Sequence, residues 1–204
     1  MHALNTTMDS IIRTLERLSP LTPEQEESLR ALQPFLCEVK IKKGGHLHRP
    51  GDIPATVAHV EKGIFGHMIT DTSGNERILR FYQEGSFIED CTAFNAQQPI
   101  EYAIQALEPC TVSYFRLMEV AHLYTAHPGF EKLGRLMMEG ASSENEKHLT
   151  MLMRYNAEER YCHLLKDSPE LAQRVSVTHL AQYLGINRVT LSKLRRRLVE
   201  RVVL

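Results

Sequence analysis

The chain has 204 residues, 43% of them hydrophobic, and a formal net charge of −1. This length and composition predict a folded globular protein of one large or two small domains, and they exclude a disordered or low-complexity chain. No apolar run approaches the roughly 20 residues of a membrane span and the N-terminus lacks a secretion signal, so we expect a cytoplasmic protein with no membrane partner.

The cysteines and histidines are scattered. The four cysteines, at positions 37, 91, 110 and 162, are too far apart for a clustered zinc or iron–sulfur site. We therefore expect reduced thiols, no metal and no cofactor. His46 and His48 alternate as ligands on a strand can, but metal or haem ligation at them is the less favoured interpretation.

The first predicted elements are helices at residues 9–18 and 23–33, separated by Ser19-Pro20. From residue 35 to 115 the helical periodicity fades, and short apolar runs alternate with turn signals about 8–12 residues apart. The runs are residues 37–41, 46–49, 56–70, 76–82, 87–89 and 101–115. This pattern predicts an antiparallel β barrel or sandwich.

A short helix is predicted at 117–125, and a long one runs from 128 to about 154. The long helix exceeds what a domain of this size needs, so we expect it to pair with the same helix of a second chain. Packing of its apolar stripe against the β domain is the alternative. The stripe consists of Phe130, Leu133, Met137, Ala141, Glu144, His148 and Met151. Two of these side chains are polar, so the pairing should be weak near them.

After a helix at 156–166 that Asn156 can cap, residues 176–198 predict two short helices with a tight turn. Ser176 is placed to cap the first helix and Asn187 the second. Gly185 lies where a left-handed residue would end the first helix. Such a pair is typical of a helix-turn-helix.

The second helix of this pair has one leucine side and one polar side. Leu191, Leu194 and Leu198 share a face at 100° per residue. The opposite face carries Val189, Ser192, Lys193 and Arg196. This geometry favours a helix that enters the major groove of DNA. An ordinary helical hairpin with a solvated basic face is the alternative.

The placement of charge favours the DNA hypothesis. Residues 175–204 contain six Lys/Arg side chains and one acidic residue, a net charge of +5, so residues 1–174 carry −6. A near-neutral protein with its positive charge gathered at one end has the electrostatic pattern of a phosphate-binding surface.

The order of these elements, together with five sequence motifs, resembles the cyclic-AMP receptor protein/fumarate–nitrate reduction regulator (Crp/Fnr) family of bacterial transcription factors. The motifs are KKGGxLxxxGD at 42–52, VAHVEKGIF at 57–65, GNERILRFYQEGSFI at 74–88, NAEERY at 156–161 and LAQYLGINRVTLSKL at 180–194. The likeness covers nearly the whole chain.

The resemblance implies an α+β fold in three parts. Residues 1–127 would form helices and a cyclic-nucleotide-binding-like antiparallel β-roll, or jelly roll. Residues 128–155 would form the dimerisation helix, and 156–204 a helix-turn-helix domain of the winged-helix type. Only six residues follow Leu198, so we expect the wing to be missing or reduced.

The effector cassette departs from the family pattern. Cyclic-nucleotide binders of the family have Gly-Glu and then, about ten residues later, Arg-Ser/Thr, whose side chains hold the cyclic phosphate. The matching positions here are Glu89 and Asp90, then Ile100 and Glu101. These residues offer carboxylates and no guanidinium to a phosphate, so we predict no cyclic-AMP binding in the usual mode.

The predicted recognition helix also departs from the family pattern, in which this helix often begins with Arg-Glu. Here the pair is Arg188-Val189, so Arg188 can still read guanine, whereas Val189 offers only apolar contact, for example to a thymine methyl. We expect Ser192 and Lys193 to face base edges as well. The candidate DNA-binding residues are Ser176, Thr178, Asn187, Arg188, Val189, Thr190, Ser192, Lys193, Arg195, Arg196 and Arg197. Of these, we expect Ser176, Thr178, Arg195 and Arg197 to contact phosphates and set the register on the duplex.

The predicted function is therefore a homodimeric transcription regulator that binds double-stranded DNA. The resemblance adds RNA polymerase and an unidentified small-molecule effector as further partners. The alternative is a small-molecule or haem-sensing module that does not read DNA. An enzyme is the poorest hypothesis, because no nucleophile elbow, zinc-protease motif or phosphate loop occurs.

Overall fold

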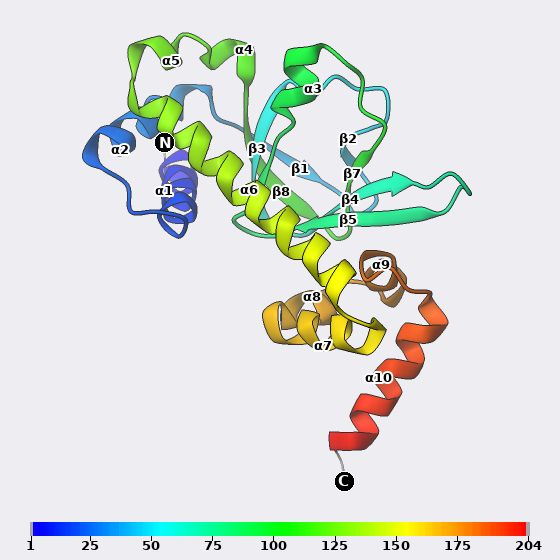
Figure 1. Ribbon diagram of the computed structural model, residues 1–204. Coiled ribbons are helices and arrows are strands. Elements are labelled where there is room, and N and C mark those ends of the chain that lie inside the picture. The colour runs from blue at the N-terminus through cyan, green and yellow to red at the C-terminus, as the bar shows by residue number, and fades with distance from the viewer. Residues whose placement is uncertain (1, 203–204) are drawn as a thin grey trace. The chain divides into compact units, whose positions relative to one another are not determined.

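The computed structural model of the chain describes residues 2–202, and for residues 2–6, 91–92, 199 and 201–202 it describes the backbone only. The described chain divides into two compact units (Figure 1). One comprises the residues up to 67 together with 81–144, and the other comprises 68–80 together with the residues from 145 onward. The division falls inside the long helix, whereas the predicted boundaries at 127/128 and 155/156 treat that helix as a separate segment.

Two four-stranded sheets form a β-roll. The turn spacing predicts an antiparallel barrel or sandwich, and the family resemblance implies the roll. Their strand orders are β1-β8-β3-β6 and β2-β7-β4-β5, and the recorded pairings of β1 with β8, β2 with β7, and β3 with β6 and β8 are antiparallel. The strands are β1 (Cys37–Ile41), β2 (His46–His48), β3 (Thr56–Lys62), β4 (Phe65–Thr70), β5 (Glu76–Tyr82), β6 (Phe87–Ile88), β7 (Ala103–Ala106) and β8 (Cys110–Arg116).

Most strand predictions are confirmed, and two are refined. The run 56–70 is not one strand, because a turn at Gly63, with φ +96°, separates β3 from β4. The run 101–115 likewise divides into β7 and β8 around Pro109. Ile64 and Leu107, one in each turn, are buried, so an apolar residue stands between the strands in both runs.

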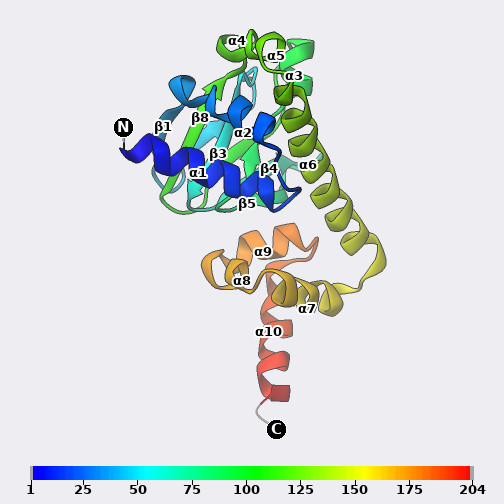
Figure 2. The ribbon, with the colours of Figure 1, turned by 90° about the vertical axis from the view of Figure 1, so that its left-hand side faces the viewer.

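The first unit has two apolar clusters, one on each face of the β3 sheet. Ala58, Val60 and Phe65, each 0% exposed, pack inside the roll with apolar side chains of β6, β7 and β8. On the other face lie the N-terminal helices α1 (His2–Glu16) and α2 (Pro23–Arg30) (Figure 2). Buried His59 of β3 marks this contact, since its Nε2 lies 3.0 Å from the Thr14 hydroxyl of α1.

Helices α3 (Cys91–Ala96), α4 (Leu117–Val120) and α5 (Leu123–Ala126) are short. The predicted helix at 117–125 is thus two helical turns with a break at Ala121 and His122. Helix α6 (Gly129–Arg154) is the long helix that the periodicity predicts. Its first half packs into the apolar cluster of α1 and α2 through Phe130 and Leu133.

The second unit is helical beyond α6. Its elements are α7 (Ala157–Asp167), α8 (Pro169–Arg174), α9 (Val177–Tyr183) and α10 (Arg188–Val202). Asn156 caps α7 as predicted: its side-chain oxygen accepts from the backbone N–H groups of Glu158 and Glu159, and the Glu159 carboxylate accepts in return from the Asn156 N–H. This capping box fixes the point at which the chain leaves α6 and begins α7.

Candidate functional site

Helices α9 and α10 are joined by a tight turn that local side chains define. The Ser176 hydroxyl accepts from the His179 N–H (3.1 Å), and the Asn187 side-chain oxygen accepts from the Thr190 N–H (2.7 Å). Gly185 between them has φ +65°, a left-handed conformation that glycine adopts without a Cβ clash. These three local predictions from the sequence are confirmed.

The inner side of the α9–α10 pair is a leucine cluster. Leu180, Leu184 and Leu191 are each 0% exposed, Ala181 is 2% exposed and Leu194 is 3% exposed. Burial of each such leucine side chain stabilises the pair by about 1.5–3 kcal/mol. Because the leucines hold the back of α10, its opposite side faces solvent.

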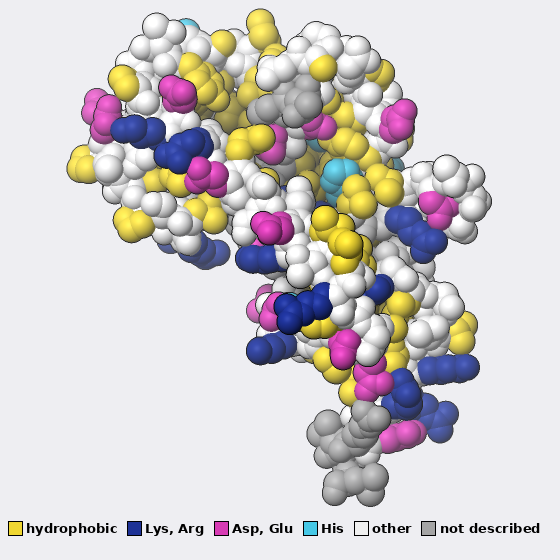
Figure 3. Space-filling model, viewed as in Figure 1, with side chains coloured by type: hydrophobic (Ala, Val, Ile, Leu, Met, Phe, Trp, Pro, Cys, Tyr) yellow, Lys and Arg dark blue, Asp and Glu magenta, His cyan; other side chains and the backbone are white. Residues whose placement is uncertain are grey.

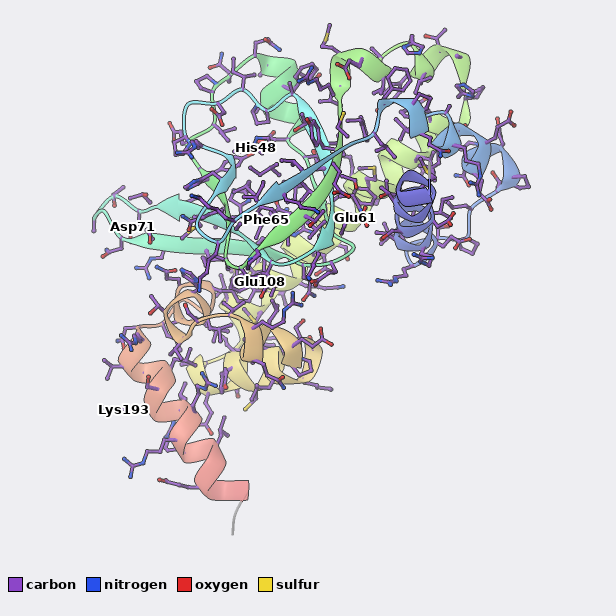
Figure 4. All side chains as sticks on the ribbon, turned by 180° about the vertical axis from the view of Figure 1, so that it is seen from behind. His48, Glu61, Phe65, Asp71, Glu108 and Lys193 are labelled. Carbon is purple, nitrogen blue, oxygen red and sulfur yellow. The ribbon has the colours of Figure 1, made fainter. Side chains whose placement is uncertain are left out.

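That outward side presents a continuous polar surface. Val189 lies among these polar side chains and is 63% exposed. Figure 4 places Lys193 on this helix, and Figure 3 shows Lys and Arg side chains gathered along α10. One shallow groove is lined by Arg188, Val189, Ser192, Lys193 and Arg196, which we call the reader face.

The cations of α10 differ in their partners. Arg196 Nε lies 2.9 Å from the Glu200 carboxylate on the same helix, and Arg197 Nη2 lies 2.8 Å from the Glu158 carboxylate of α7. Among the described residues, Arg188 and Lys193 have no carboxylate partner. These two side chains therefore carry the least neutralised charge of the reader face.

The remaining predicted DNA contacts lie around the same helix pair. Ser176 and Thr178 are both exposed at the start of α9. Thr190 and Arg195 are half-buried on α10. A hydroxyl or guanidinium at these positions can reach an oxyanion beside the reader face.

Arg160 of α7 is a positioning residue that the sequence analysis did not single out. Its guanidinium donates to three backbone carbonyls: Tyr155 (2.8 Å), Leu184 (2.9 Å) and Leu152 (2.7 Å). These carbonyls belong to the C-terminal ends of α6 and α9, whose last C=O groups lack helical partners. The motif NAEERY contains Arg160, but its letters do not tell which carbonyls the side chain reaches.

His148 of α6 provides a second link to α9. Its ring stacks on Tyr183 with 4.1 Å between centroids and 4° between planes, and its Nε2 donates to the Tyr183 carbonyl oxygen at 3.1 Å. Burial lowers the pKa of His148, more than the hydrogen bond to Tyr183 raises it. The ring is therefore an internal contact of the second unit, although its spacing places it in the predicted dimer stripe.

The four cassette residues have four different environments. Asp90 caps α3 through the Ala93 N–H (2.8 Å) and also accepts from the Tyr102 hydroxyl (2.7 Å). Ile100 is 6% exposed, whereas Glu101 is exposed. Glu89 is half-buried on the other face of the sheet, where it lines a cavity with Val57 and His59. The sequence alone did not predict this separation.

Tyr102 is the side-chain hydrogen-bond donor to Asp90. Burial, together with the neighbouring Asp90 carboxylate, raises the pKa of Tyr102 above its ordinary value. The phenol therefore keeps its proton and donates a hydrogen bond to Asp90. His67 lies beside this pair, with its ring centroid 4.2 Å from that of Tyr102. Each carboxylate oxygen of Asp90 therefore already accepts one hydrogen bond from within the protein.

The predicted dimer stripe of α6 lies partly inside its own protomer. Phe130, Leu133 and Met151 are 5%, 3% and 6% exposed, so these side chains leave little surface for a second chain. Met137 and Ala141 are half-buried and Glu144 is exposed. The alternative interpretation, packing within the chain, thus applies to the buried members. The large exposed apolar side chains of α6 are instead Met138, Leu149 and Met153, at 47%, 58% and 80%.

The described residues contain neither a metal-binding cluster nor a membrane span. No group of three or more His, Cys, Asp or Glu side chains is placed to hold a metal ion within residues 2–202. No helix in that range has both the length and the apolar composition to cross a membrane.

The comparisons with known proteins agree on the fold. The family model described as the cyclic nucleotide-binding domain matches residues 38–127, which include all eight strands except the first residue of β1. No curated protein matches the sequence.

Solved structures with a similar fold include transcription regulators. FixK2 from Bradyrhizobium japonicum has a TM-score of 0.68 and 20% identity, over 81% of this chain and 85% of its own. The c-di-GMP-responsive global regulator CLP of Xanthomonas campestris has a TM-score of 0.68 and 17% identity, over 86% and 92%. A CRP/FNR family transcriptional regulator from Thermus thermophilus has a TM-score of 0.59 and 18% identity, over 81% and 87%. At these identities the likeness shows the fold.

Proposed function

We propose that this chain, which has the fold of Crp/Fnr transcription regulators and a cyclic nucleotide-binding domain, is a homodimeric regulator that binds specific sites on double-stranded DNA. In this proposal α9 and α10 form its helix-turn-helix, and α10 is the recognition helix. The β-roll would serve as a sensor domain.

The reader face of α10 is the observation that carries the proposal. Leucines bury the back of this helix, while Arg188, Val189 and Lys193 stand exposed on the front. A DNA-reading helix can place an exposed apolar side chain such as Val189, which is 63% exposed, against a thymine methyl. The +5 charge of residues 175–204 would attract the phosphate backbone.

In this proposal the polar side chains of α9 and α10 divide into those that contact bases and those that contact phosphates. Arg188 would donate two hydrogen bonds to the O6 and N7 of a guanine, and Ser192 and Lys193 would contact the next base edges. Ser176, Thr178 and Arg195 would hold phosphates and set the register. The Glu158 carboxylate would compete with phosphate for the Arg197 guanidinium, so the contribution of Arg197 should be smaller. Asn187 acts mainly as the helix cap that orients Arg188.

A dimer is the second part of the proposal. Two recognition helices, one per chain, would read half-sites about 34 Å apart, one turn of duplex. We assign the dimer contact to the exposed apolar residues Leu149 and Met153 of α6, in place of the buried stripe residues Phe130, Leu133 and Met151.

The sensor domain would not use cyclic AMP in the family's usual way. Ile100 stands where the phosphate-binding arginine is expected, and it is buried. Asp90, which accepts from Ala93 and Tyr102, would repel a phosphate rather than bind it. The effector that controls this regulator, if the family mechanism applies, must therefore enter elsewhere or bind by other chemistry.

The test of DNA binding is a site selection with the purified protein and random duplexes, followed by titration of a selected duplex at several salt concentrations. We expect a two-fold symmetric site and an affinity that falls steeply as salt rises, because each phosphate contact releases counterions. Cyclic AMP should leave the binding curve unchanged. A protein that selects no site, or that binds all duplexes equally, would not be the proposed regulator.

Replacement of Arg188 by Ala tests the assigned reader. We expect this variant to lose about 1–3 kcal/mol of binding free energy and to accept any base pair at one position of each half-site. Arg49→Ala, which removes an exposed cation from the other unit, is the matched control and should bind as the parent does. Unchanged base preference in Arg188→Ala would show that α10 does not read the sequence as assigned.

A further inference from the structure

A cavity of about 350 Å³ lies between the β1-β8-β3-β6 sheet and helices α1, α2 and α6. All of its lining residues belong to the first unit. Its volume falls in the range of pockets that hold small organic ligands. The apolar side chains that form most of its wall include Ile11, Leu15, Phe115, Phe130, Leu133 and Met137.

This cavity is not the interior of the roll. Side chains alternate along a strand, so neighbouring residues point to opposite faces of the sheet. On β3, Ala58 and Val60 pack into the roll, whereas Val57 and His59 line the cavity. The cavity therefore opens on the outer face of the sheet, between the N-terminal helices and the first half of α6.

One polar group in the cavity wall lacks a partner. The Ser113 side chain is 2% exposed, lines the cavity, and its hydroxyl has no hydrogen-bond partner among the described residues. By contrast, His59, equally buried in the same wall, lies 3.0 Å from the Thr14 hydroxyl and 2.9 Å from the Glu61 carboxylate. A buried hydroxyl without a partner is unfavourable, and a ligand oxygen would satisfy it.

The charged side chains of the cavity wall restrict the charge that a ligand can carry. Glu89 and Glu131 bring two carboxylates to the cavity, and the guanidinium of Arg135 is paired with Glu139 at 2.8 Å. A buried anion would therefore lack a dedicated cation while meeting like charge. Apart from these charged side chains and from Ser113, His59 and Tyr124, the wall is apolar, which favours an uncharged ligand.

We infer that this cavity binds an uncharged, largely apolar small molecule whose single oxygen accepts a hydrogen bond from Ser113. The ligand would lie against the face of α6 that contains Leu133, Gly134 and Met137. Binding does not depend on the proposed DNA recognition, so it is tested on the free protein.

The probes are decan-2-one, decanoate and decane, each measured by displacement of the neutral fluorophore N-phenyl-1-naphthylamine from the purified full chain. Decan-2-one should displace the fluorophore, and decanoate should bind at least about tenfold more weakly because its charge would be buried without a partner. Decanoate binding as tightly as decan-2-one would overturn the inference.

Two variants locate the site. Gly134 lines the cavity, and a side chain there meets only the Tyr124 hydroxyl, 3.6 Å from the added Cβ, so Gly134→Leu should fill the cavity and abolish displacement. Ser142→Leu adds the same side chain at an exposed position of α6 and should bind as the parent does. Normal binding by a folded Gly134→Leu would place the probe elsewhere and refute the site.

Ser113→Ala tests the hydrogen bond and remains decisive if Gly134→Leu does not fold. The affinity for decan-2-one should fall about fivefold relative to that for decane, because only the ketone uses the hydroxyl. An unchanged ratio of the two affinities would show that Ser113 does not contact the ligand oxygen, and the inference would fail.

Discussion

At the scale of single residues, His148 shows how burial changes the chemistry of a side chain. The ring stacks on Tyr183, donates to its carbonyl and lies near the Arg160 guanidinium. Burial and this guanidinium both lower the pKa of His148 below 6.5. The native protein thus holds the neutral imidazole, whereas the unfolded chain can protonate it at mildly acidic pH.

This difference predicts a pH dependence of stability. Below pH 6.5 the unfolded state binds a proton at His148 more readily than the native state does. The contribution of His148 to the free energy of unfolding is therefore fully present above that pH, and it is lost as the pH falls toward the lowered native pKa. We expect the melting temperature of the parent to fall between about pH 7.5 and about pH 5.5 by more than that of His148→Phe, which keeps a stacking ring but cannot titrate. Parallel melting curves for the two proteins would contradict the assignment.

At the scale of elements, the β3–β4 turn depends on a glycine for two separate reasons. Gly63 has φ +96°, and a Cβ at this position would lie 2.8 Å from the Pro109 carbonyl oxygen and 2.9 Å from the Cys110 Cα. Its N–H also donates to the Glu84 carboxylate at 2.8 Å. A side chain at position 63 would therefore be disfavoured both by the left-handed backbone conformation and by contact with the β7–β8 turn.

A pair of alanine variants separates the two effects. Gly74, with φ +81° and no atom within 4 Å of an added Cβ, should lose only about 1 kcal/mol on replacement by Ala, the cost of the left-handed backbone. Gly63→Ala adds the clash with backbone atoms and should lose about 2–4 kcal/mol. Chemical denaturation of both variants measures these values. Equal losses would show that the Pro109 backbone moves away at little cost.

At the scale of the whole molecule, the exposed apolar side chains of α6 mark the surface that a second copy would cover. Leu149 and Met153 are four residues apart and 58% and 80% exposed, so they lie on one side of the helix. An exposed apolar pair on a long helix is the kind of surface that pairs with its own copy.

We predict that Leu149→Glu combined with Met153→Glu converts a dimer into monomers, because two carboxylates per chain would then face each other in an apolar contact. Sedimentation equilibrium of the purified protein measures the change. Thr150→Glu, which adds a charge at an exposed neighbouring position on another side of α6, should leave the dimer intact. A variant that still sediments as a dimer would place the contact elsewhere on the chain.

Much of the fold and of the reader face could be predicted from local sequence. The caps at Asn156, Ser176 and Asn187 and the turn at Gly185 are confirmed because each depends on a few neighbouring residues. The antiparallel strands are confirmed for the same reason, since alternation and turn residues are read within short windows. The exposure of Lys193 follows once the leucines define the back of its helix.

The sequence by itself therefore determined which segments form most of the helices and strands, but not all of their ends, and which side of α10 is polar. Only the tertiary structure decided what each apolar face packs against, and it buried Phe130 and Leu133 in their own unit. It also decided two polar contacts, because it brought Arg160 to the ends of α6 and α9 and placed the Tyr102 hydroxyl against Asp90. It also enclosed Ser113 in an apolar cavity. Periodicity identifies a face but not its partner, because that partner is set by contacts between residues far apart in the chain.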